Sequence, residues 1–200
     1  MKKILCILLS VLTLCLCFTG CAKIVDETGP SSEEPTNHSK VKFTMENGGE
    51  FIIELYPEYA PKTVDNFLKL VKDGFYDGLT FHRVVEGFMA QGGQHPQEAI
   101  MDIMTIEGEF ASNGFTQNTL KHERGIISMA RTPDPNSAST QFFICYDAAP
   151  HLDGDYAAFG KVIEGMEVVD DFLKIERTMG FDGALSSPVE PITIKTAVVI

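Results

Sequence analysis

Residues 81–93 read FHRVVEGFMAQGG, which is two short apolar runs separated by a Glu-Gly pair. Runs of this length around a glycine are typical of neighbouring β-strands. Strict alternation places Phe81, Arg83 and Val85 on one face of the first strand, opposite to the intervening residues. An arginine among apolar neighbours either packs its stem along them or donates hydrogen bonds at the edge of a pocket. The segment therefore predicts strands and leaves both roles of Arg83 open.

The same pattern of short apolar runs ended by glycine or proline continues on both sides of this segment. The predicted strands are 41–45, 51–55, 79–85, 88–91, 125–130, 140–146, 157–163 and 192–200. Pro61 opens a predicted helix that Gly74 ends, and a second short helix is predicted over 166–175. Many short strands, two helices and no regular alternation of strand with helix favour a mainly β fold, a closed antiparallel barrel. We therefore predict one barrel domain over residues 41–200.

Charge and cysteine content exclude several classes of function. The 200 residues include 28 Asp and Glu against 16 Lys and Arg, a net charge of −12. Nucleic-acid binding needs a basic surface, and anionic lipid surfaces also attract basic segments, so neither is an expected partner. Cys145 is the only cysteine after residue 21. One thiol forms neither an internal disulfide framework nor a cysteine metal site.

The beginning of the sequence is typical of an export signal. Lys2 and Lys3 precede an apolar run of 15 residues over 4–18. A helix of this length is about 22 Å long, short of the roughly 30 Å hydrocarbon core of a bilayer. Residues 1–20 are therefore predicted to be a secretory signal peptide rather than a membrane span.

A cysteine directly follows this signal. Residues 18–21, FTGC, resemble a bacterial lipobox, which implies cleavage before Cys21 and attachment of lipid to its thiol. The alternative is an ordinary signal peptide followed by an accidental cysteine. Residues 21–40 are mostly polar, contain two prolines and predict a flexible tether. We therefore expect an exported domain that faces away from the cytoplasm and is held at the cell membrane by its lipid anchor alone.

Five long motifs together resemble the cyclophilin family of peptidyl-prolyl isomerases. They are FHRVVEGFMAQGG (81–93), GEFASNGF (108–115), LKHERGIISMAR (120–131), NSASTQFFI (136–144) and HLDGDYAAFGKVIEGMEVVD (151–170). The similarity extends in order over essentially all of residues 41–200. It implies a closed eight-stranded antiparallel barrel capped by two α-helices, which agrees with the predicted strands and helices. It also implies isomerisation of X–Pro peptide bonds.

The resemblance further implies an active site. Arg83 corresponds to the family's catalytic arginine, and we expect Phe88 and Gln91 to act beside it. The substrate-binding positions implied in the same way are Met89, Ala130, Arg131, Gln141, Phe143, His151, Leu152 and Tyr156. Neither a metal ion nor an organic cofactor is implied. The expected partners are proline-containing peptides and unfolded or exported proteins, bound by a monomer.

Two places depart from the family pattern. His151 stands where the animal members carry tryptophan, and this chain contains no Trp. An imidazole covers less apolar surface than an indole, so the resemblance implies weaker binding of the inhibitor cyclosporin, with catalysis less affected. Residues 94–101, QHPQEAIM, replace a loop that is usually rich in glycine. This replacement puts the secondary pocket beside the proline site, and with it the substrate preference, in doubt.

Other kinds of chemistry are disfavoured by spacing. The five histidines show no paired ligand spacing and are interpreted as surface or satisfied polar residues. Ser128 lacks the G-x-S-x-G context of a hydrolase nucleophile, and Cys145 is interpreted as a small core residue. The serious alternative is a proline-peptide-binding or holdase module with little turnover, because uniform binding gives no rate gain. The presence of Arg83 argues for activity, since a pure binder has little need of that donor.

Overall fold

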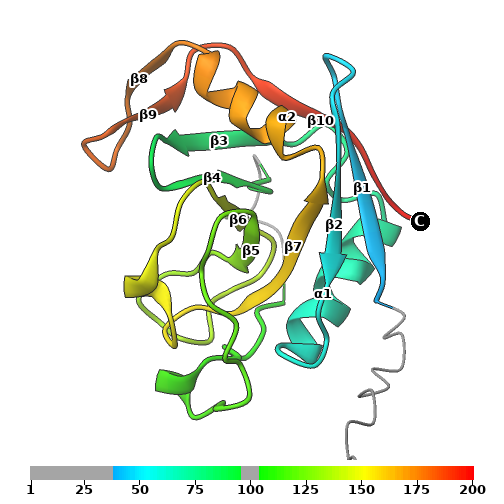
Figure 1. Ribbon diagram of the computed structural model, residues 1–200, viewed down its shortest axis with the longest axis vertical. Helices are drawn as coiled ribbons and strands as arrows, with labels where there is room; N and C mark the ends of the chain where they lie inside the picture. Colours follow the sequence, from blue (N-terminus) through cyan, green and yellow to red (C-terminus); the bar gives the residue numbers. More distant parts are fainter. Residues whose placement is uncertain (1–37, 96–103) are drawn as a thin grey trace, which may run out of the picture. The chain divides into compact units, whose positions relative to one another are not determined.

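Eight antiparallel strands surround an apolar interior (Figure 1). The computed structural model describes residues 38–95 and 104–200, so the predicted signal peptide, Cys21, most of the tether and most of the unusual loop at 94–101 lie outside the described residues. The barrel strands are β1 (Lys40–Met45), β2 (Glu50–Leu55), β3 (Thr80–Val85), β4 (Met89–Gly92), β5 (Ile126–Met129), β6 (Phe142–Cys145), β7 (Ala158–Glu164) and β10 (Ile192–Val199).

The strands close into a ring in the order β1-β10-β3-β4-β6-β5-β7-β2, with β2 paired back to β1. Each neighbouring pair is antiparallel. Closure satisfies the hydrogen-bonding groups at both edges of the sheet. The predicted closed eight-stranded barrel is confirmed, as is each of the eight strands within a few residues of its predicted ends.

Two helices pack against the barrel, at different ends of it in Figure 1. The helix predicted from Pro61 is confirmed as α1 (Pro61–Lys72), which buries Val64, Phe67 and Val71 at helical spacing. The predicted second helix is shorter than expected: α2 (Met166–Asp171) continues as the 3₁₀ turn η4 (Phe172–Lys174). Short 3₁₀ turns η2 (Ala111–Asn113) and η3 (Pro150–Leu152) lie in the long connections.

The N-terminus of α1 is capped from a distant part of the chain. Ala60, the residue before the helix, offers no side-chain hydrogen bond. The buried carboxylate of Glu109 instead accepts hydrogen bonds from the backbone N–H of Lys62 at 2.9 Å, the N–H of Thr63 at 2.8 Å and the Thr63 hydroxyl at 2.7 Å. A carboxylate is favoured here because it satisfies unpaired N–H groups and complements the helix dipole.

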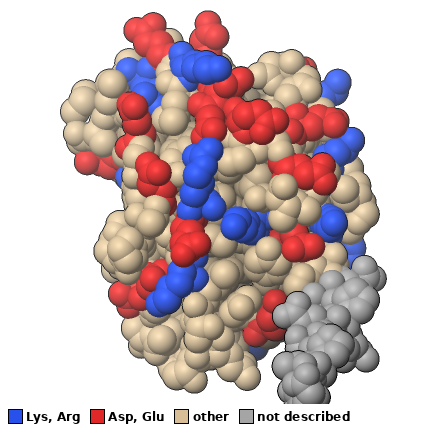
Figure 2. Space-filling model, viewed as in Figure 1, with Lys and Arg blue, Asp and Glu red and all other residues tan. Residues whose placement is uncertain are grey.

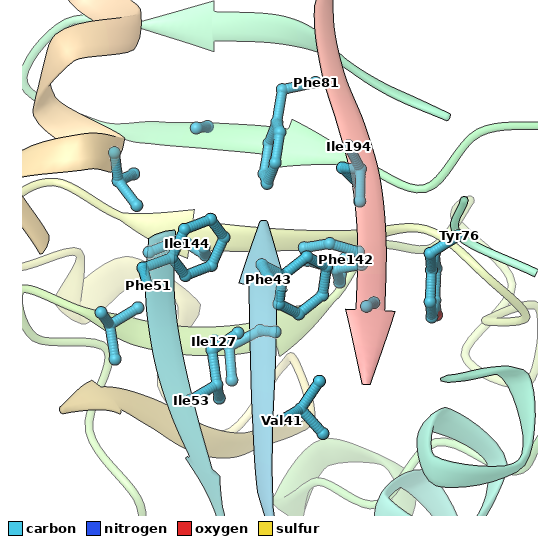
Figure 3. Close-up of a cluster of buried hydrophobic side chains, with 14 of the residues drawn as sticks. Val41, Phe43, Phe51, Ile53, Tyr76, Phe81, Ile127, Phe142, Ile144 and Ile194 are labelled. Carbon is cyan, nitrogen blue, oxygen red and sulfur yellow. The ribbon is translucent and has the colours of Figure 1, made fainter. Parts of the chain in front are cut away.

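Aromatic side chains fill the interior of the barrel (Figure 3). Phe43 and Phe51, partners on β1 and β2, stack with ring centroids 4.9 Å apart. Phe142 of β6 meets Phe67 of α1 edge to face at 5.6 Å, one of the arrangements that aromatic pairs favour. Full burial of each such side chain contributes about 1.5–3 kcal/mol relative to exposure. In the described part of the chain this core stands without a disulfide, because Cys145 is a free thiol.

One prediction about β3 is wrong. Phe81 and Val84 are buried in the barrel core, whereas Arg83 and Val85 lie on the outer face. The pairing of β3 with β4 shifts register between Phe81 and Arg83, which marks a β-bulge. A bulge inserts one residue and reverses the alternation beyond it. Phe81 and Arg83 therefore do not share a face, and the bulge directs Arg83 out of the barrel wall.

A second, small sheet was not predicted. β8 (Arg177–Met179) and β9 (Leu185–Pro188) form a two-stranded hairpin after α2. Its strands have three and four residues, and much of the hairpin is exposed, so neither shows the alternation of a half-buried strand. Figure 1 shows the hairpin projecting beside β3 and β4.

The surface fits the acidic composition. On the face shown in Figure 2, acidic and basic side chains are interspersed, and the basic ones do not merge into a broad patch. Within residues 38–95 and 104–200, no helix combines the length and the apolar character needed to cross a bilayer.

Candidate active site

A second apolar cluster lies on the outer face of the barrel wall. Its buried members are Met89, Phe143, Cys145, Ala149 and Leu152, with Val85, Phe88, Ala130 and Tyr156 partly buried against them. Alternation separates this cluster from the core, because Phe142 points into the barrel and the next residue, Phe143, points out. The wall made by β3, β4 and β6 thus carries apolar side chains on both faces.

This outer cluster forms the floor of an open cavity of about 370 Å³. The cavity is lined by Arg83, Phe88, Met89, Gln91, Ala130, Arg131, Phe143, Leu152, Tyr156, Phe181 and Asp182. All but two of the predicted catalytic and substrate-binding residues therefore line one cavity. The two exceptions, Gln141 and His151, do not line it but contact residues that do: the Gln141 side chain bonds to Gln91, and the His151 ring lies 5.6 Å from that of Phe88.

Arg83 is held at the mouth of the cavity by an ion pair. Its Nε donates to Oδ2 of Asp182 at 2.6 Å, and both side chains are mostly buried. Its guanidinium carbon also lies 5.9 Å from the centre of the Phe88 ring. The hydrogen bond from Arg83, helped by one from the backbone N–H of Ala184, lowers the pKa of Asp182 from its ordinary 3.8 to about 2. Asp182 is therefore charged at any physiological pH.

The rest of the guanidinium faces a polar strip on the cavity wall. Nη1 of Arg83 makes only long contacts within the described residues, 3.5 Å to Oε1 of Gln91 and 3.8 Å to Sδ of Met89. Gln91 in turn donates from Nε2 to Oε1 of Gln141 at 2.9 Å. Nε is thus committed to Asp182, while the terminal nitrogens remain able to donate into the cavity.

Arg131 also lines the cavity. Its guanidinium carbon lies 4.5 Å from the centre of the Tyr156 ring and 5.1 Å from that of Phe110. Nε and Nη2 both donate to the backbone carbonyl of Asp155, at 3.1 Å and 2.9 Å. These donors already form hydrogen bonds within the protein, so the side chain of Arg131 stabilises the cavity wall near Tyr156.

A buried polar chain supports the floor from behind. His122 lies between Asp153 and Ser128, with 3.0 Å from Nδ1 to Asp153 Oδ1 and 3.0 Å from Nε2 to Ser128 Oγ. The imidazole stacks on Phe143 with ring centroids 6.0 Å apart. Burial lowers the pKa of His122, although the hydrogen bond to the Asp153 carboxylate opposes this. A neutral ring that donates to Asp153 and accepts from Ser128 fits these contacts.

The hydrogen-bonded series Asp153–His122–Ser128 is arranged as in a hydrolase triad, but a substrate cannot reach it. Ser128 and His122 are both buried, and neither lines the cavity that contains Arg83. The interpretation of His122 as a satisfied polar residue is confirmed, and its ring packs against Phe143 of the cavity floor. Cys145 is likewise buried, and burial raises the pKa of its thiol to about 12, which is unsuited to a nucleophile.

Sequence reasoning missed two cavity residues, Phe181 and Asp182. Both lie in the turn of the unpredicted β8–β9 hairpin, and Asp182 is 99 residues from its partner Arg83. No motif includes them, and nothing local in GFDG, residues 180–183, signals a contact with the site. As for metals, the described residues contain no cluster of three or more His, Cys, Asp or Glu side chains that could hold an ion.

Comparison with known proteins relates this geometry to a family. Residues 40–199 match the family model described as cyclophilin type peptidyl-prolyl cis-trans isomerase/CLD. The chain is 46% identical over 126 residues to peptidyl-prolyl cis-trans isomerase B of Bacillus subtilis (strain 168), a match that covers 62% of this chain and 84% of that protein. It is 38% identical over 165 residues to a probable peptidyl-prolyl cis-trans isomerase of Brucella suis biovar 1, which covers 79% and 81%.

Solved structures agree with these matches. A cyclophilin type peptidyl-prolyl cis-trans isomerase of Cryptosporidium parvum, crystallised in the presence of the dipeptide Ala-Pro, superposes with a TM-score of 0.66 at 30% identity. That match covers 80% of this chain and 98% of the solved one. Because the family model spans the whole barrel, the chain belongs to the family of cyclophilin-type peptidyl-prolyl cis-trans isomerases.

Proposed function

We propose that the barrel domain isomerises X–Pro bonds by holding the proline ring in the apolar cavity while Arg83 stabilises the twisted amide. The observation that carries this proposal is the juxtaposition of a fixed guanidinium with an apolar floor in one open cavity of about 370 Å³. No covalent bond forms or breaks in this reaction, so binding geometry alone has to supply the rate gain.

The barrier arises from the partial double bond of the amide. Rotation about an X–Pro bond costs about 18–20 kcal/mol and takes tens to hundreds of seconds. As the bond twists, the proline nitrogen regains its lone pair and becomes a hydrogen-bond acceptor. A guanidinium that donates more strongly to the twisted amide than to the planar one lowers the barrier. Arg83 suits this role because its charge is permanent and Asp182 already fixes its orientation.

The decisive test compares the Arg83→Ala variant with the unchanged domain on a short Ala-Pro peptide. A fragment of residues 37–200 includes His38 and Ser39, which contact β2 and its end. We expect kcat/KM to fall about 10²-fold, equivalent to ~2.7 kcal/mol of lost transition-state stabilisation. Circular dichroism checks that the fold is unchanged. Arg124→Ala, which removes an arginine in a surface ion pair with Asp170, is the matched control and should retain activity.

Two results would contradict the proposal. If the unchanged fragment folds but does not accelerate isomerisation, the domain is a proline-peptide-binding or holdase module instead. If Arg83→Ala is as active as Arg124→Ala, the domain is an isomerase but Arg83 does not stabilise the twisted amide.

We further propose that the enzyme is an exported lipoprotein that assists the folding of exported polypeptides. The support is the signal-like segment 1–20, the lipobox-like FTGC ending at Cys21 and the polar stretch that follows. In a bacterial host that is fed a labelled fatty acid, the full chain should incorporate label and sediment with membranes. Cys21→Ser should abolish both, whereas Cys17→Ser, a control within the signal, should leave them intact. Export without label, in the unchanged chain, would favour an ordinary signal peptide.

A further inference from the structure

A large apolar side chain is exposed at the mouth of the active site. Phe181, in the turn of the β8–β9 hairpin, is 93% exposed yet lines the same cavity as Arg83 and Phe88. Figure 2 shows an uncharged lobe at the upper left, where Figure 1 places the tip of this hairpin. Exposed apolar surface that borders a concave site is typical of a binding surface.

The hairpin turn holds Phe181 in place. Its neighbour Asp182 bonds to Arg83 through Oδ2 at 2.6 Å and accepts through Oδ1 from the Ser186 hydroxyl at 2.8 Å and the Ala184 N–H at 3.0 Å. On the other side, Gly180 donates its N–H to the carbonyl of Ala184 at 2.8 Å. Because both flanking residues are anchored, the phenyl ring is presented at the cavity from a fixed backbone.

The surroundings of the ring select an uncharged occupant. Arg83 bonds to Asp182, the residue next to Phe181, and its charge is compensated by that ionised carboxylate. An ion pair of this kind offers little net attraction to a charged client side chain, whereas the phenyl ring offers apolar contact area.

We propose that Phe181 forms an apolar subsite for a client residue close to the proline, with preference for an aromatic or branched aliphatic side chain. This inference rests on the proposed function, because the occupant is the same extended polypeptide whose proline fills the cavity. Successive residues of an extended chain are about 3.3 Å apart, so a residue within about two positions of the proline is the one that meets the ring. Continuity with the proline cavity is what singles out the client chain as the occupant.

The test measures a ratio of specificities in the full chain. For each protein, kcat/KM is compared between Ala-Pro peptides with Phe at positions flanking the dipeptide and the same peptides with Ala there. We expect the unchanged protein to favour the Phe peptides and Phe181→Ser to reduce that preference about fivefold to tenfold, the effect of losing one partly buried apolar contact. Met179→Ser is the matched control, because Met179 is 66% exposed on the same hairpin but does not line the cavity.

Two outcomes overturn the inference, and a third separates it from the proposed function. Equal losses on both kinds of peptide would show that Phe181 supports the site without selecting a side chain. In the second outcome, Phe181→Ser leaves the ratio of kcat/KM between Phe and Ala peptides unchanged but dissociates a dimer that the unchanged protein forms. The residue that covers Phe181 would then belong to a second copy of the chain. If the unchanged protein proved inactive, the proposed function would fail by itself. The dissociation constants of the same peptides for the unchanged protein, Phe181→Ser and Met179→Ser would then show whether Phe181 binds a client side chain.

Discussion

Arg83 depends on a residue that no sequence motif includes. A free arginine side chain samples many rotamers, and catalysis by a charge requires that the charge already be oriented when the amide twists. Asp182 supplies this orientation by accepting a hydrogen bond from Nε, which leaves the terminal nitrogens able to donate into the cavity. The hydrogen bonds from Ser186 and Ala184 fix Asp182 in turn. The arginine that we propose as catalytic is therefore positioned jointly by β3 and by the β8–β9 hairpin.

Replacing Asp182 with Asn should lower kcat about threefold to tenfold with a smaller change in KM, because the neutral amide holds the guanidinium less firmly. The pH profile provides a second readout. The folded-state pKa of Asp182 is about 2, below its ordinary 3.8, so the ion pair's contribution to stability is complete above about pH 4 and is lost only as the pH falls through about 2. We therefore expect kcat/KM of the unchanged enzyme to show no inflection from this group between about pH 5 and pH 9.

Stopped-flow or protease-coupled assays across that range would check both expectations. An inflection near pH 5 that disappears in Asp182→Asn would contradict the assigned ionisation. Asp134→Asn, which alters an exposed aspartate in the loop after β5, is the control for a nonspecific loss of charge.

At the scale of the element, α1 illustrates how a helix end is completed by tertiary structure. The sequence around Pro61 places the start of the helix correctly, but the residue before it, Ala60, cannot cap. The cap is Glu109, 46 residues away from Thr63, in the GEFASNGF segment. This contact also ties the connection between β4 and β5 to α1. The folding of that connection is thus coupled to the stability of α1.

Changing Glu109 to Gln should lower the free energy of unfolding by about 1–3 kcal/mol, since it weakens charge-assisted hydrogen bonds to buried N–H groups. Glu107→Gln is the matched control. Glu107 pairs with Lys62, and both side chains are largely exposed, so its loss should cost less than about 1 kcal/mol. Urea unfolding of both variants would measure the difference. Equal effects would mean that the buried cap contributes nothing beyond surface charge.

The sequence predicts elements whose signal is local and misses those whose signal is not. The barrel strands alternate or form apolar runs, and α1 has apolar residues at helical spacing, so these are found. The bulge after Phe81 cannot be predicted, because it depends on how β3 pairs with β4 and not on the residue types within β3. The β8–β9 hairpin is short and exposed, and Asp182 in its turn contacts Arg83, which is 99 residues away in the sequence. The candidate site could therefore be predicted wherever the family motifs reach, but not at the hairpin.

At the scale of the whole molecule, one wall of the barrel serves two functions. Side chains that point inward from β3, β4 and β6 join the aromatic core, and those that point outward make the floor of the cavity. The rigid core supports the floor because both are made by alternate residues of the same strands. Residues that form the cavity floor therefore alternate with residues that stabilise the fold. Substitutions at two neighbouring positions should affect peptide binding and stability separately.

Phe142 and Phe143 provide that separation. Phe142 is fully buried among the rings of Phe43, Phe67 and Phe81, so Phe142→Leu should lower the free energy of unfolding by about 1–3 kcal/mol while the folded fraction keeps near-normal kcat/KM. Phe143→Leu should instead lower kcat/KM about tenfold by reshaping the floor, with the smaller loss of stability. Denaturant unfolding and peptide assays on both variants distinguish the two effects. Parallel losses in both quantities would mean that the core and the floor are one cooperative unit rather than two faces of a wall.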